Sequence, residues 1–216
     1  MSDHNLLLSL PVVLGASIIA DWLPLKCTGC LDAAVCNRKL RGFFLCLLRA
    51  PGFRFTLPSE SVLRDDSLYQ YSQCRGMMLL SLYVKRGFRL DVIERMLQQS
   101  GSSITDVAIG DVPSNSHAYL NLVAKYCNGL KVIHLDSCDL DHSFLSILQK
   151  NTLTLTGLRL LHPNVSPHLL KNVRLTNLIM LILEGVEITD SVFTAFLCIT
   201  TKNVTILTIF DCSVSP

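Results

Sequence analysis

Charged side chains are scarce in this 216-residue chain: they make up 17% of it, and the formal net charge is only +2. Proteins that bind nucleic acid through its phosphates normally carry a clear basic excess, so this balance argues against such a partner. One local basic excess exists, at Arg38, Lys39, Arg41, Arg49 and Arg54. No aromatic residues interleave with it in a nucleic-acid motif, and we interpret it as a solvated helix face.

The chain also lacks an apolar run long enough to cross a bilayer. The longest run, residues 6–20, falls short of the roughly 20 residues a helix needs and contains Pro11. Its start, Ser2-Asp3-His4, has no basic residue of the kind that opens a signal peptide. We expect no membrane partner and a cytoplasmic and/or nuclear location. A secreted protein is the alternative, which a processed N-terminus would reveal.

Catalytic signatures are missing as well. Gly101, Gly110 and Gly129 are too widely spaced for a phosphate-binding loop. The histidines are scattered along the second half, so no nucleophile–base pair can be argued. We therefore predict no catalytic residue, no cofactor and a protein that is not an enzyme.

The cysteines give only a weak metal signal. Cys27 and Cys30 form a C-x-x-C pair, but Cys36 and Cys46 are far apart on a predicted helix and make no second ligand turn. No strand precedes the pair, as a thioredoxin-type site would require. The count of nine is odd, and most cysteines have apolar neighbours. We expect reduced, buried thiols in an intracellular protein and no metal site.

What the chain has in abundance is a repeated leucine pattern. The spacing L-x-x-L-x-L-x-x-C-x-L recurs at intervals of roughly 25 residues, within the range of leucine-rich repeats. Its copies are Leu130/Ile133/Leu135/Cys138/Leu140, Leu155/Leu158/Leu160/Pro163/Val165, Leu178/Leu181/Leu183/Val186/Ile188 and Val204/Leu207/Ile209/Cys212/Val214, with looser copies at Ile104/Val107/Ile109/Val112 and Met77/Leu80/Leu82.

Each copy predicts one short strand with a buried face, followed by a return segment. Apolar residues at helical spacing predict helices over residues 119–126, 144–148 and 192–197, and a short turn near Ser166-Pro167-His168. One such unit cannot bury its own apolar face, so neighbours must stack into a parallel sheet with helices on its convex side. Cys138 and Cys212 should point inward. An ordinary α/β domain is the alternative.

This pattern resembles the cysteine-containing class of leucine-rich repeats, which implies an α/β solenoid whose concave strand face binds other proteins. The strand residues that face outward then line up across that face. The candidate partner-binding residues are His134, Asp136, Arg159, Leu161, Ile182, Glu184 and Phe210. The last copies are more apolar on this face than the first ones, so the alternative is that a further stretch of chain or a dimer partner covers them.

The first fifty residues predict helices. Pro11 suits a first helical turn, Pro24 ends that segment, and a second helix should run from about Leu31 to Leu48, before Pro51-Gly52. Residues 53–76 separate these helices from the first clear strand, so we expect that they do not cap it. The segment 89–101 is the better candidate for a capping helix.

The order Leu10-Pro11, Ile18-Ile19, Trp22-Leu23 and Leu31-Asp32-Ala33-Ala34-Val35-Cys36-Asn37-Arg38 resembles an F-box. The resemblance implies docking on a Skp-type adaptor of a cullin–RING ubiquitin ligase, with the repeats selecting the protein to be modified. The implied adaptor-binding residues are Leu10, Pro11, Leu14, Ile18, Ile19, Trp22, Leu23, Leu31 and Val35. The alternative is a plain binding scaffold whose N-terminal helices only cap the repeats.

The sequence thus predicts three segments. Residues 1–52 form an all-α, F-box-like module, and residues 53–102 form a helical linker and cap or a degenerate first repeat. Residues 103–216 form a C-terminally incomplete array of leucine-rich repeats. We predict a non-catalytic substrate receptor.

Overall fold

The computed structural model describes residues 10–23, 25–35, 38–50, 53–55, 66–112, 116–165, 169, 173–189 and 203–215. These residues form a mixed α/β protein in which all paired strands run parallel. The helices are α1 (Val12–Trp22), α2 (Leu25–Ala34), α3 (Arg38–Leu48), α4 (Ser67–Arg75), α5 (Leu90–Ser100), α6 (Ser116–Tyr126) and α7 (His142–Lys150).

The main sheet has six strands in the order β11-β9-β7-β5-β4-β3, which is the reverse of their sequence order without a single skipped neighbour. They are β3 (Ser81–Val84), β4 (Asp106–Gly110), β5 (Val132–Asp136), β7 (Gly157–Leu161), β9 (Met180–Glu184) and β11 (Ile206–Phe210). Two-residue and three-residue strands form small side sheets: β1 (Arg54–Phe55) with β2 (Met78–Leu79), β6 (Asp139–Leu140) with β8 (Asn164–Val165), and β10 (Glu187–Thr189) with β12 (Ser213–Ser215).

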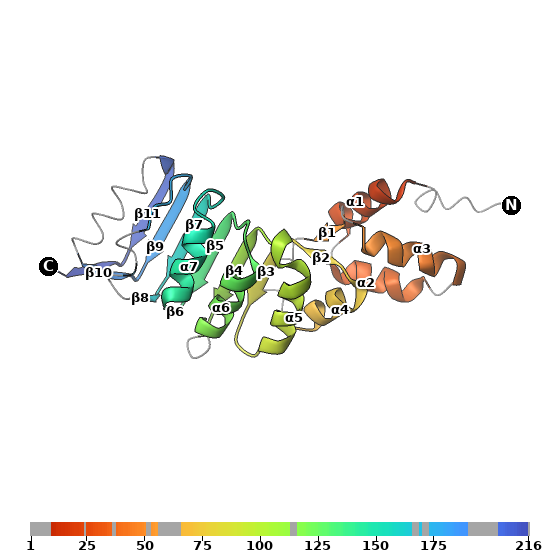
Figure 1. Cartoon of the computed structure of the whole chain (residues 1–216), viewed down its shortest axis with the longest axis horizontal. Helices are drawn as coiled ribbons and strands as arrows, with labels where there is room; N and C mark the ends of the chain where they lie inside the picture. Colours follow the sequence, from red (N-terminus) through yellow and green to blue (C-terminus); the bar gives the residue numbers. More distant parts are fainter. Residues whose placement is uncertain are drawn as a thin grey trace.

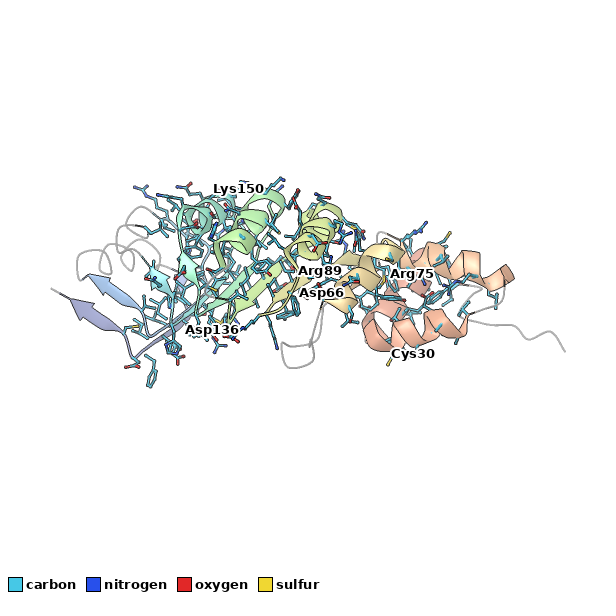
Figure 2. All side chains as sticks on the ribbon, turned by 90° about the horizontal axis from the view of Figure 1, so that it is seen from below. Cys30, Asp66, Arg75, Arg89, Asp136 and Lys150 are labelled. Carbon is cyan, nitrogen blue, oxygen red and sulfur yellow. The ribbon has the colours of Figure 1, made fainter. Side chains whose placement is uncertain are left out.

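Helices α5, α6 and α7 lie side by side on one face of this sheet (Figure 1). The opposite face carries no helix among the described residues. Figure 2 shows the two faces edge-on, with Lys150 on the helix side and Asp136 on the other. We call the latter the open face. The prediction of parallel strands with helices on one side is confirmed.

The chain turns in the same way after five of these strands. The residue that follows each strand has a positive φ: Asp111 (54°), Ser137 (52°), His162 (44°), Gly185 (62°) and Asp211 (50°). Each of the first four donates its amide hydrogen to a carbonyl at the end of the next strand. Cys138 is buried at this turn and donates its thiol to the carbonyl of Ile109, and Cys212 repeats the contact with Leu183. The predicted inward direction of both cysteines is confirmed.

The predicted first copy of the repeat, Met77/Leu80/Leu82, is displaced by two residues from the register that the strands adopt. Leu82 pairs with Val107 and Val84 with Ile109, so the residues equivalent to Ile104, Val107 and Ile109 are Leu79, Leu82 and Val84. These three are buried, whereas Leu80 is only half-buried. Apolar residues at almost every position from Met77 to Val84 hid the alternation that fixes a register.

The predicted helices are confirmed at α5, α6 and α7. The single helix predicted between residues 31 and 48 is wrong, because the chain forms two helices there, α2 and α3. The helix expected at residues 192–197 and the turn expected at 166–168 lie outside the described residues.

The N-terminal helices close the β3 end of the sheet. Helix α1 packs against β1, and the strand pair β1–β2 continues into β3. Ala16, Ile19, Phe44 and Leu47 belong to the same continuous apolar core as the sheet residues. The expectation that these helices do not cap the first strand is therefore wrong.

A tyrosine completes this closure. Tyr69 of α4 is fully buried, and its hydroxyl both donates to the carbonyl of Tyr83 and accepts from the amide of Tyr83, each at 2.7 Å. One side chain thus satisfies a donor and an acceptor that the edge strand β3 would otherwise leave unpaired.

Candidate protein-interaction surfaces

Helix α1 carries an apolar stripe that faces solvent. Pro11, Leu14, Ile18 and Trp22 recur at helical spacing, which places them on one side of the helix. Leu14 is 49% exposed and Trp22 is 78% exposed, while Ile18 is half-buried. Val13, beside them, is also exposed. We call Pro11, Leu14, Ile18 and Trp22 the α1 stripe.

The other side of α1 is buried. Gly15, Ala16 and Ile19 face the core. Of the residues predicted to bind an adaptor, Ile19 is therefore a core residue that is 1% exposed. Leu23, Leu31 and Val35 are half-buried and pack against the core, and Leu10 is half-buried at the start of the helix. The structure thus groups Pro11, Leu14, Ile18 and Trp22 on one surface and separates the remaining predicted residues from it.

A buried carboxylate holds the N-terminal helices together. Asp32 of α2 is 3% exposed and forms ion pairs with Arg41 of α3, at 2.6 Å, and with Arg75 of α4, at 2.8 Å. Arg41 also donates to the Asp32 carbonyl, and the Arg75 guanidinium lies over the ring of Tyr71. Burial and the nearby Asp32 carboxylate raise the pKa of Tyr71 to about 12.

Sequence reasoning missed this cluster. An acidic residue inside the apolar run Leu31–Val35 is its one signal, because a charge amid core residues requires a partner. The sequence does not reveal which basic residues supply that partner, since Arg75 is 43 positions away.

The open face of the sheet contains all seven residues predicted to bind a partner. In one row across the strands, Ala108, His134, Arg159, Ile182 and Thr208 are register partners. In the next row the partners are Gly110, Asp136, Leu161, Glu184 and Phe210. The predicted alignment of these residues is confirmed, because it follows from an identical parallel register at every strand pair.

The chemistry of the open face changes along each strand. The row that starts the strands is apolar at Val132, Gly157, Met180 and Ile206. A Cβ at Gly157 would lie 3.1 Å from Met180 Cε and 3.4 Å from Val132 Cγ2, so these two side chains close over the glycine. The row that ends the strands carries the carboxylates of Asp136 and Glu184. Arg159 lies between the apolar row and the acidic row.

The β11 end of the sheet remains open among the described residues. Leu207 and Ile209 are register partners of Leu181 and Leu183, which are fully buried, yet they are 49% and 41% exposed. Ile206 and Phe210, on the open face, are exposed as well. The two ends of the sheet therefore differ, since α1–α3 and Tyr69 cover the β3 end.

The described cysteines differ in exposure: Cys74 is exposed and Cys212 is half-buried. Cys27, Cys30 and Cys46 are exposed, so the expectation that they are buried is wrong; Cys36 lies outside the described residues. Cys127 and Cys138 are buried, and burial raises the pKa of each thiol to about 12. No group of three or more potential metal ligands occurs among the described residues. No helix in the described part of the chain has the length and apolar character of a bilayer-spanning segment.

These features define a mixed α/β protein with two separate exposed surfaces, the α1 stripe and the open face. No protein-family model matches the sequence, and no curated protein resembles it closely enough to count as a match.

Proposed function

We propose that this protein is a non-catalytic interaction receptor: the substrate-recognition subunit of a cullin–RING ubiquitin ligase of the Skp–cullin–F-box type. Helices α1–α3 act as an F-box-like module that docks on a Skp-type adaptor. The parallel strands act as leucine-rich repeats whose open face holds the protein to be modified. The mechanism is proximity, because other subunits supply the chemistry.

The observation that carries this proposal is the α1 stripe. A helix that only caps a repeat array needs an apolar inner face and a polar outer face. Helix α1 has apolar residues on both sides, with Ala16 and Ile19 in the core and Leu14 and Trp22 in solvent, and its one charged residue is the exposed Asp21. An exposed tryptophan within an apolar stripe has the composition of a binding hot spot.

The second candidate function is a plain repeat scaffold whose N-terminal helices are only a cap. The continuous core favours it, because α1–α3 do cover the β3 end of the sheet. In the receptor function the outer side of α1 binds an adaptor, whereas in the scaffold function it binds none. A test of that side therefore distinguishes the two functions.

The test is a variant that changes only the outer side of α1. In Leu14→Ala/Ile18→Ala/Trp22→Ala, we expect an unchanged fold and loss of binding to a purified Skp-type adaptor, measured by calorimetry. The loss should be at least tenfold, because buried interface hot spots each contribute about 2 kcal/mol or more. Leu153→Ala is the matched control, since Leu153 is 77% exposed but lies after α7.

If the wild-type chain does not bind the adaptor, the receptor function is wrong. If the triple variant unfolds, the stripe is needed for folding, as the scaffold function expects. Circular dichroism of both variants distinguishes these results.

A further inference from the structure

Arg159 is the one arginine or lysine in the central row of the open face, which runs from Ala108 to Thr208. It lies on β7, with His134 on one side and Ile182 on the other. Leu158 and Leu160, its neighbours along the strand, are fully buried in the core, so Arg159 must point the opposite way. Its side chain is half-buried rather than extended into solvent.

The Nε–H group of Arg159 is buried and has no hydrogen-bond acceptor among the described residues. The two carboxylates of the adjacent row are engaged elsewhere. Asp136 accepts a hydrogen bond from the Ser137 hydroxyl at 3.0 Å, and Glu184 Oε1 lies 3.6 Å from His162 Nε2. A buried donor without an acceptor is destabilising, and native proteins rarely retain one without a reason.

The surroundings of Arg159 restrict what could supply that acceptor. On the side of the strand starts, Val132 and Met180 offer an apolar surface over Gly157. On the side of the strand ends, Asp136 and Glu184 flank Leu161. These two carboxylates repel a doubly charged anion and disfavour any second negative group, but one carboxylate can sit against the guanidinium.

We infer that Arg159 recognises a single carboxylate in an extended peptide segment of the bound protein, next to an apolar side chain that packs on Val132 and Met180. The carboxylate belongs to an aspartate or glutamate side chain or to a C-terminus. This inference rests on the proposed function, because it names the class of segment that the receptor selects.

The experiment is a selection from randomised peptides against the full chain, in two arms. One arm displays internal peptides with blocked ends, and the other displays free C-termini. We expect the selected peptides to share one Asp or Glu beside an apolar residue in the first arm, or an apolar residue near the free carboxylate in the second. The arm that enriches identifies the source of the carboxylate.

The selected peptide is then synthesised and titrated against variants. Arg159→Gln should weaken its binding about tenfold or more, since a charge-assisted hydrogen bond is among the stronger polar contacts. Arg86→Gln is the matched control, because Arg86 is an exposed arginine in the turn after β3. Asp136→Asn should leave binding intact or tighten it.

The inference is overturned if no peptide is enriched, if the enriched peptides lack a carboxylate, or if Arg159→Gln binds the peptide as well as the wild type does. Tighter binding of a phosphoserine version of the same peptide would overturn it as well. Adaptor binding is measured separately, with variants of the α1 stripe. An incorrect peptide inference can therefore be distinguished from an incorrect proposed function.

Discussion

At the turns that follow the strands, single side chains at repeated positions supply hydrogen bonds to backbone carbonyls. Cys138 is buried just after β5, where its thiol donates to the carbonyl of Ile109 at 3.5 Å and to that of Asp136 at 3.2 Å. A serine would fit but bury a stronger polar group, and an alanine would leave the carbonyls without this donor. The thiol therefore stabilises the turn only while it is protonated.

Because the pKa of the Cys138 thiol is raised, we expect the folded chain to lose stability in alkaline solution. Its pKa is about 12 in the folded chain, against an ordinary value of 9.0, because burial disfavours the thiolate. Its contribution is complete below about pH 9 and is lost as the pH rises from there toward 12, since the unfolded chain releases the proton first. Each pH unit in that window should cost up to about 1.4 kcal/mol from this group.

Urea unfolding at pH 8 and at pH 10.5 measures this effect. Cys138→Ala should be less stable than the wild type at pH 8, and its stability should fall less steeply between the two pH values. The thiol of Cys127, whose pKa is also about 12, gives the wild type a second group with the same behaviour. Equal pH slopes for the wild type and Cys138→Ala would contradict the prediction.

At the scale of elements, helices α2, α3 and α4 meet at Asp32. Its position in the last turn of α2 is unfavourable for a carboxylate, because the helix end carries partial negative charge. Arg41 and Arg75 offset this, and each of them is about one-third exposed. The pair with Arg41 is an ion pair only, since Oδ1 accepts no well-directed hydrogen bond in the described structure.

Asp32→Ala should loosen the three helices. Loss of the buried carboxylate removes both ion pairs, and we expect a destabilisation of about 2 kcal/mol. This is less than the full cost of an isolated buried charge, because the two arginines can regain water. Asp91→Ala is the control, since Asp91 pairs with Arg89 and Arg95 at an exposed site and should change stability little. Equal destabilisation of the two variants in urea unfolding would contradict the prediction.

The sequence predicts an element well where the residues of that element alone determine its structure. The alternation at Val132–Asp136 fixes both the strand and the face on which His134 and Asp136 lie, so the open face could be predicted residue by residue. The separation of α2 from α3 could not, because no proline or glycine lies in the sequence between Ala34 and Arg38. The prediction placed Ile19 with the residues of the α1 stripe, because Ile18 and Ile19 are adjacent and equally apolar, and the sequence does not show which of the two is buried.

At the scale of the whole molecule, the N-terminal helices and the sheet share one core. Ile19 and Phe44 belong to the same continuous cluster of buried apolar residues as Leu79 and Leu82. Two units that share a core and a side sheet should unfold together rather than one after the other. The two exposed surfaces are then held in a fixed relation, as a receptor that works by proximity requires.

A cavity in the N-terminal helices should therefore destabilise the distant strands. Ile19 is 1% exposed, and Ile19→Ala should cost about 2–5 kcal/mol. Because unfolding is shared, amide exchange should accelerate in β5 and β7 as well as in α1, and calorimetry should show one transition at a lower temperature. Val13→Ala, a truncation of a 63% exposed residue on the same helix, should leave both readouts unchanged. If exchange accelerates in α1–α3 alone, or if a second transition emerges, the helices form an independent unit, and the fixed relation between the two surfaces is lost.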